Sequence, residues 1–175
     1  LLGLVTYQTA SSYTLTVIPL FILMGQFATH ARMGADLYQC LYRWIGFLPG
    51  GLAMATIAAC ACFSSVSGSS LATAATMGNV ALPEMKRFRY DDRLATGSVA
   101  AGGTLGILIP PSTVMVIYGV LTEQPIDKLF ISGILPGLLL SGLFVITIVM
   151  LTFRNPDLGP PGPRFTLHER LFSLG

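Results

Sequence analysis

The chain has 175 residues, of which 53% are hydrophobic and only 10% are charged, whereas an ordinary soluble domain carries about 25% charged residues. No Asp, Glu, Lys or Arg occurs in residues 1–31, 44–83, 94–122 or 129–153. Charge-free runs of this length argue against a soluble globular domain, a disordered chain and a nucleic-acid binder, and favour an all-α integral membrane protein. A net charge of +2 is too small to suggest an anionic polymer as partner.

The first predicted element is a membrane-spanning helix from about Tyr13 to Ala31, in which Pro19 and Gly25 are embedded. About 19 residues at ~1.5 Å each give ~28 Å, which is enough to cross the hydrocarbon of a bilayer. The second element, residues 37–48, combines Trp44 and two tyrosines with a single charge. This mixture is typical of a helix that lies along the membrane surface.

The third element is predicted to be a re-entrant helical hairpin. Gly50–Phe63 and Leu71–Leu82 are small and apolar, and the polar run Ser64–Ser70 separates them. Each arm has about 12 to 14 residues, or about 18–21 Å of helix, which is too short to cross a ~30 Å core alone. We therefore expect two short helices that meet at a non-helical, serine-rich tip inside the membrane, where irregular backbone is tolerated if protein or water surrounds it.

The fourth element, residues 94–121, is predicted to be a discontinuous helix because Gly102–Ser112 contains three glycines and the pair Pro110-Pro111. Two adjacent prolines remove two backbone donors, and glycine permits unusual dihedral angles. A simple kink at the prolines is the alternative. The fifth element, residues 129–153, is a continuous span with Pro136 near its start.

Basic residues predict the topology. The loop 84–93 carries four of them, and the tail carries Arg154, Arg164 and Arg170, whereas the loop 122–128 has only Lys128. The positive-inside rule places the first two segments in the cytoplasm and the third outside. Arg32 and Arg43 also indicate the cytoplasmic side, so the hairpin enters and leaves on that side.

The two interrupted segments are the candidate functional site. Helix ends inside a membrane present free carbonyls at one end and free N–H groups at the other. Carbonyls and hydroxyls suit Na⁺, and helix N-termini suit carboxylates. Packing of small residues is the alternative, and we prefer it for 53–61 and 72–81. The expected Na⁺ site comprises Ser64, Ser65, Ser67, Gly68, Gly103, Gly106, Pro110 and Ser112, and the expected solute contacts are Ser69, Ser70 and Thr73.

Several motifs resemble those of the large membrane (DctM-like) subunit of tripartite ATP-independent periplasmic (TRAP) transporters. The most specific is Gly102–Ser112, GGTLGILIPPS. The others are Ile18–Gly25, Gly78–Met85, Tyr90-Asp91, Ile117–Gly119, Thr122-Glu123 and Gly133–Gly137. The resemblance covers residues 13–153. Since the chain begins at Leu1 and ends at Gly175 after a charged amphipathic stretch, we expect it to be the N-terminal repeat of a longer protein.

The resemblance implies an elevator-type, Na⁺-coupled symporter of the bacterial inner membrane that imports small organic acids, such as C4-dicarboxylates or sialic acid. It implies two protein partners, a small membrane subunit and a periplasmic substrate-binding protein, and no organic cofactor. The implied division is a scaffold of helix and arm (residues 1–49), a transport domain (50–121) and a membrane helix with a cytoplasmic linker (122–175).

Other function classes remain as alternatives. Another ion-coupled anion transporter of the same superfamily, a channel and a membrane anchor all fit an apolar multi-span chain. An intramembrane enzyme would need a Ser/Lys, Ser/His or Asp/Asp pair at membrane depth, and the charge-free runs contain none. We therefore expect a transporter and not an enzyme.

Overall fold

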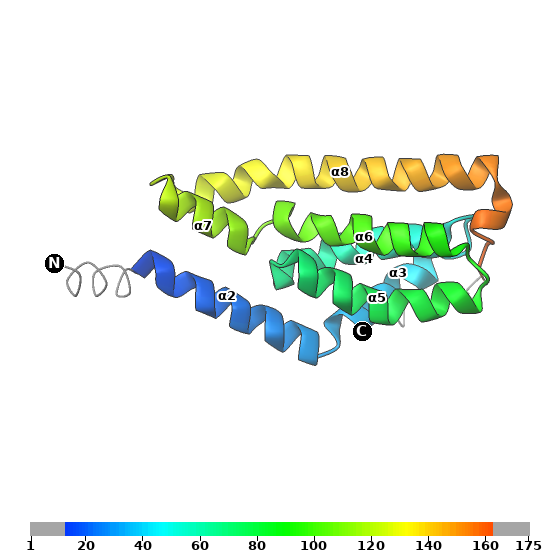
Figure 1. Cartoon of the computed structure of the whole chain (residues 1–175), viewed down its shortest axis with the longest axis horizontal. Helices are drawn as coiled ribbons and strands as arrows, with labels where there is room; N and C mark the ends of the chain where they lie inside the picture. Colours follow the sequence, from blue (N-terminus) through cyan, green and yellow to red (C-terminus); the bar gives the residue numbers. More distant parts are fainter. Residues whose placement is uncertain (1–12, 163–175) are drawn as a thin grey trace.

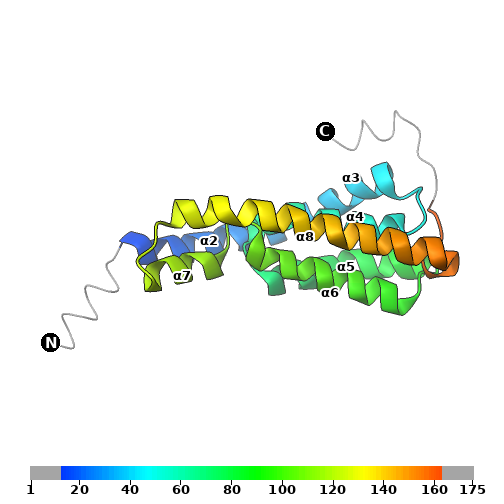
Figure 2. The same ribbon diagram turned by 90° about the horizontal axis from the view of Figure 1, so that it is seen from above.

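The computed structural model describes residues 13–162, and all regular secondary structure in that range is helical, as predicted. The charged stretch before Gly175, with Arg164 and Arg170, lies outside the described residues. Figures 1 and 2 show an elongated bundle. Its helices are α2 (Tyr13–His30), α3 (Met33–Ile45), α4 (Gly51–Ser67), α5 (Ser70–Arg87), α6 (Asp92–Leu108), α7 (Thr113–Leu121) and α8 (Ile126–Arg154), followed by the short 3₁₀ helix η1 (Pro156–Leu158).

Two stretches of the described residues are long and apolar enough to cross a membrane. One is 92–121, which comprises α6 and α7, and the other is α8, with mean hydropathies of 1.8 and 2.5. They correspond to the fourth and fifth predicted elements. Most large side chains of α8 face outward; Leu135 and Phe153, for example, are 75% and 78% exposed. Such a surface suits contact with lipid or with other membrane helices.

The predicted helical hairpin is present as α4 and α5, and α6 packs against both arms (Figure 1). Its boundaries differ from the prediction. The arms have 17 and 18 residues, or about 26–27 Å of helix, because Ser64–Ser67 belong to α4 and α5 runs from Ser70 through Pro83 to Arg87. The prediction that all of Ser64–Ser70 is non-helical was wrong, since only Gly68 and Ser69 lie outside the helices.

Ser65 is compatible with helix because its hydroxyl finds an acceptor in the preceding turn. Ser65 Oγ donates to the Cys62 carbonyl at 2.7 Å, a bond within its own helix. Gly68 ends α4 with φ of 58°, and its N–H donates to the Ser64 carbonyl. Ser69 then caps α5 by accepting a bond from the Ala72 N–H. One glycine and one serine are therefore enough for the turn.

The break in the fourth element is also shorter than predicted. Helix α6 continues through the glycines to Leu108, and the chain is non-helical only over residues 109–112, which include both prolines. A break at the prolines is therefore confirmed, but one that begins at Gly102 was wrong. Glycine costs a helix only about 1 kcal/mol, and close packing against a neighbouring helix can offset that cost, whereas proline removes a hydrogen bond and clashes with the preceding turn.

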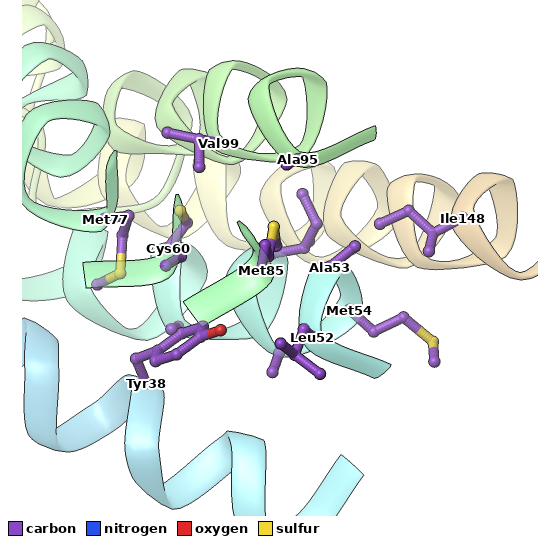
Figure 3. Packing of buried hydrophobic residues seen from close by; sticks show 14 of the residues in the cluster. Tyr38, Leu52, Ala53, Met54, Cys60, Met77, Met85, Ala95, Val99 and Ile148 are labelled. Atoms are coloured by element: carbon purple, nitrogen blue, oxygen red, sulfur yellow. The ribbon is translucent and has the colours of Figure 1, made fainter. Parts of the chain in front are cut away.

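Helix α4 is the centre of the core. It is buried along most of its length, and Figure 3 shows side chains of α3, α5, α6 and α8 gathered around it. Its many alanines allow these helices to approach closely. Tyr38 of α3, 1% exposed, is packed against α4, so the predicted surface helix is attached to the hairpin on one face. The opposite face exposes Gln39 and Trp44.

A segment that sequence reasoning missed crosses the base of the hairpin. Residues 155–162, here called the strap, follow α8 and form backbone hydrogen bonds with two connections. Gly50 N–H donates to the Gly159 carbonyl at 2.9 Å, and Asp91 N–H donates to that of Leu158 at 3.1 Å. Gly162 N–H donates to the Gly46 carbonyl at 2.8 Å. The strap therefore holds the start of α4, the α5–α6 connection and the end of α8 together.

Tyr90 contributes a hydrogen bond at the same base. Its side chain is buried, and its hydroxyl oxygen accepts the Leu52 N–H at 3.2 Å in the first turn of α4, where Gly50 offers no side-chain cap. Burial raises the pKa of Tyr90 to about 12, so the phenol is neutral at physiological pH. The bond satisfies one of the N–H groups that a helix N-terminus leaves free.

We expect Tyr90→Phe to lower the free energy of unfolding by about 1–2 kcal/mol, because the Leu52 N–H remains buried without an acceptor. Thermal unfolding of the intact, detergent-solubilised protein measures this. Tyr118→Phe is the matched control, since the Tyr118 side chain is exposed. Equal unfolding temperatures for the two variants would mean that water or another group accepts the hydrogen bond of the Leu52 N–H in place of Tyr90.

Candidate functional site

The hairpin tip and the helix break meet in the middle of the long axis of the molecule (Figure 1). The Gly68 carbonyl accepts two hydrogen bonds from Thr113, one from its N–H at 3.3 Å and one from its hydroxyl at 3.2 Å. A Cβ atom at Gly68 would lie 2.7 Å from the Pro111 carbonyl oxygen, so only glycine fits. The two segments that the sequence singled out are therefore in direct backbone contact.

The glycines of α6 form the surface on which the tip rests. A Cβ at Gly103 would lie 2.8 Å from Ala74 Cβ. At Gly106 it would lie 2.7 Å from the Ser70 nitrogen and 2.8 Å from the Ser69 carbonyl oxygen. Both glycines are helical, so they bring the backbones of α6 and the tip together without adding an unwound stretch.

A third element, α2, reaches the tip at Gly25. A Cβ there would lie 2.9 Å from the Ser67 carbonyl oxygen. Beside this contact is a cavity of about 290 Å³ between the three segments. It is lined by Ile22, Gly25 and Gln26 of α2, by Ser67, Ser69 and Ala72 of the hairpin, and by Thr113 and Ile117 of α7. Sequence reasoning missed Gln26 and Thr113, although Thr113 directly follows the proline motif.

Two hydroxyl groups at the site are buried without a partner. Ser64 and Ser112 have no exposed surface, and their Oγ atoms have no hydrogen-bond partner within the described part of the chain. Both residues adjoin Gly68, since the Ser64 carbonyl accepts the Gly68 N–H and Ser112 lies in the opposing break. A buried hydroxyl without a partner costs about 1–3 kcal/mol, so such groups call for an explanation, and an ion or ordered water supplies one.

Four helix ends surround these hydroxyls. Helices α4 and α6 end here, at Ser67 and Leu108, and α5 and α7 begin here, at Ser70 and Thr113. The C-terminal ends present carbonyl oxygens with partial negative charge, which favour a cation, and the N-terminal ends favour an anion. Because residues 44–83 and 94–122 contain no charged side chain, neutral oxygens and helix dipoles dominate the local electrostatics.

The remaining predicted residues differ in position. Ser67 Oγ and Thr73 Oγ1 are buried and bonded to each other at 2.8 Å, while Ser69 and Ser70 are half-buried at the tip. Ser65 faces outward. Pro110 is on the other side of the break, where it lines an apolar cavity of about 310 Å³ against α8. The structure therefore gathers nine of the eleven around the contact of tip and break, and it leaves out Ser65 and Pro110.

Comparison with known proteins identifies relatives across almost the whole chain. Residues 2–171 match the sequence profile of the family described as "Tripartite ATP-independent periplasmic transporter, DctM component". The C4-dicarboxylate TRAP transporter large permease protein DctM of Pseudomonas aeruginosa is 42% identical over 98% of this chain and 40% of its own length. The isethionate TRAP transporter permease protein DctMQ of Oleidesulfovibrio alaskensis is 38% identical over 77% of the chain and 21% of its own length.

A third relative is the ectoine/5-hydroxyectoine TRAP transporter large permease protein UehC of Ruegeria pomeroyi. It is 36% identical over 90% of this chain and 36% of its own length. The chain thus spans at most about two fifths of these relatives.

Proposed function

Because the chain belongs to the DctM component family of tripartite ATP-independent periplasmic transporters, we propose that it is part of a Na⁺-coupled symporter that imports small organic acids across the bacterial inner membrane. The complete transporter is longer than this chain, so the activity is that of the whole assembly. The proposed partners are a small membrane subunit and a periplasmic binding protein that supplies the solute.

The buried hydroxyls of Ser64 and Ser112 carry the proposal of sodium coupling. Na⁺ is a hard cation, and hydroxyl and carbonyl oxygens are suitable ligands for it. The ends of α4 and α6 supply carbonyls beside the two hydroxyls, and Gly68 allows the tip to approach the break. Bound Na⁺ would leave one net positive charge in a site without charged side chains, and this charge favours an anionic solute.

The solute is proposed to be a small organic anion held beside the ion. The names of the relatives mention C4-dicarboxylate, isethionate and ectoine, all small molecules with an acidic group. The N-terminal ends of α5 and α7 offer N–H groups and hydroxyls that suit a carboxylate. Ser69 and Ser70 are half-buried at this position and are proposed to contact the solute. Thr73 is buried, so its proposed contribution is indirect, through its hydrogen bond to Ser67.

The transport mechanism is proposed to be of the elevator type in a multi-pass membrane protein. Residues 50–121 would form the moving part, with α4 and α5 as a re-entrant hairpin that enters the membrane from the cytoplasmic side, and residues 1–49 would belong to the scaffold. Residues 122–175 would connect to the rest of the transporter. Sodium-dependent counterflow of solute in vesicles tests this against a channel, which would conduct without saturable exchange.

Single substitutions at the two hydroxyls test the ion site. We expect Ser64→Ala and Ser112→Ala each to raise the sodium concentration for half-maximal uptake about tenfold, because each removes one ligand of about 1.4 kcal/mol. In sodium-free buffer the same variants should be at least as stable as the unmodified protein, since an unpaired buried hydroxyl has been removed. Thermal unfolding in Na⁺ and in choline separates these two effects.

Ser132→Ala is the control, because the Ser132 hydroxyl is exposed and bonded to its own helix. Ser65→Ala tests the sequence-based assignment of Ser65, whose hydroxyl faces outward. Unchanged sodium dependence in both Ser64→Ala and Ser112→Ala, or uptake that a proton gradient drives equally well in choline, would exclude the proposed ion site.

A further inference from the structure

A third cavity, remote from the ion site, lies between α6 and α8 at the base of the hairpin. It has a volume of about 440 Å³, and Ile57 of α4 contributes to its lining. Arg93 and Asn155 lie at one end, and Ala101 and Phe144 mark the other. Figure 1 shows α6 and α8 side by side along this stretch. From Arg93 to Ala101 the groove follows α6 for about 12 Å.

The middle of the groove is open at Gly97. Apart from the adjoining residues and backbone of its own helix, no described atom lies within 4 Å of the position that a Cβ of Gly97 would occupy, and Gly97 lines the cavity. Gly142 of α8 has equally open space, but it does not line the cavity. Gly97 therefore lies inside the groove and Gly142 outside it, and a Cβ at either position meets no neighbouring element. The two glycines can serve as a test position and its matched control.

The two ends of the groove differ in chemistry. Its interior is apolar, with Leu94, Ile148 and Leu151 among its walls, whereas a guanidinium stands at its mouth. Arg93 forms no ion pair with another described residue, and the neighbouring Asp91 carboxylate accepts the Arg93 backbone N–H at 2.8 Å. The apolar interior can hold about 12 Å of a lipid acyl chain. The guanidinium at its mouth can bind the phosphate of the same lipid.

We propose that this groove binds a phospholipid of the cytoplasmic leaflet, with an acyl chain between α6 and α8 and its phosphate on Arg93. The leaflet follows from the proposed orientation, in which Lys86 and Arg87 at the end of α5 and Arg89 of the α5–α6 connection face the cytoplasm. The assignment therefore rests on the proposed membrane function. The bound chain fills the space beside Gly97, between α6 and α8, and reaches Ile57 of α4.

A photoreactive lipid tests this in the intact transporter. The protein is reconstituted in phosphatidylethanolamine vesicles that contain a small fraction of phosphatidylglycerol with a diazirine in the middle of one acyl chain. After irradiation, mass spectrometry maps the adducts. We expect adducts on the α8 peptide that contains Phe144 and Ile148, and about tenfold fewer in Gly97→Leu, which fills the groove. Gly142→Leu, the same change outside the groove, should leave them unchanged.

Arg93→Gln tests the headgroup contact separately and should reduce the adducts about fivefold, because a charge-assisted hydrogen bond is lost. If Gly97→Leu fails to fold, Thr147→Trp blocks the groove from an exposed position of α8. Equal adduct yields in the groove variants and the control would overturn the proposal. So would cross-linking of the groove to another segment of the transporter, which would then be its occupant. Sodium-dependent uptake, measured in parallel, reports separately on the proposed function.

Discussion

Replacement of Gly106 by alanine is expected to lower sodium-driven uptake by the complete transporter at least about tenfold. The added methyl group would lie 2.7 Å from the Ser70 nitrogen and 2.8 Å from the Ser69 carbonyl oxygen. Both are backbone atoms of the tip, so they cannot rotate away as a flexible side chain would. Helix α6 and the tip must separate, at a cost of about 1–3 kcal/mol, and the separation displaces the proposed ion ligands.

Gly78→Ala is the matched control for Gly106→Ala. Gly78 lies on the hairpin arm α5, and the nearest atom to its added Cβ would be Val99 Cγ1 at 3.8 Å, an ordinary contact. We expect this variant to retain uptake and to gain slightly in stability, since alanine favours helix. Uptake into vesicles is measured for both variants. Binding of solute by the isolated periplasmic protein is measured alongside, to establish that delivery of the solute is the same in both cases. If Gly106→Ala transports within about twofold of the unmodified protein, the tip does not need its present position.

Replacing Pro110 and Pro111 together by alanine should have the second large effect. The break over residues 109–112 exists because neither proline can donate to the preceding turn of α6. Two alanines restore those donors, so we expect α6 to extend and the protein to become slightly more stable, by about 1 kcal/mol. The same extension removes the Pro111 and Thr113 backbone from Gly68, so uptake should fall at least about tenfold.

Pro136→Ala is the control for the double variant, because Pro136 lies inside α8, which is already helical at this point. It should preserve uptake. The decisive combination is stability without transport in the double variant, measured by thermal unfolding and by vesicle uptake. Normal uptake in the double variant would mean that the proline break is only a kink, the alternative that the sequence left open.

Local sequence signals differ in how reliably they predict the backbone of this chain. The break at Pro110-Pro111 was predicted correctly because two adjacent prolines remove two successive backbone donors, whereas the single proline Pro136 is accommodated inside α8. Serine and glycine only disfavour helix by about 1 kcal/mol or less, and tertiary contacts reverse such preferences. For that reason the predictions of irregular backbone failed at Ser64–Ser67 and at Gly102–Gly106.

What sequence reasoning missed depends on contacts between distant residues. Tyr90 accepts the Leu52 N–H across 38 positions, and no local pattern marks a tyrosine as a cap for a remote helix. The position of the strap could not be predicted either, because its hydrogen bonds to the two connections are formed by backbone groups, which every sequence has. Among the predicted ion ligands, a seven-residue run offered no way to distinguish Ser64, which is buried, from Ser65, which faces outward. Distinguishing them requires knowing which face of α4 is turned toward α6.

The strap also bears on how such a protein can arise. The backbone bond from Gly50 to Gly159 places the entrance of the segment that runs from the hairpin to α8 directly beside its exit. A segment whose ends are neighbours can be inserted, excised or copied in tandem without stretching the chain that flanks it. Duplication of this segment would create a second hairpin and a second broken helix in a single genetic step. Each copy would contain its own backbone hydrogen bond between the two ends of the segment.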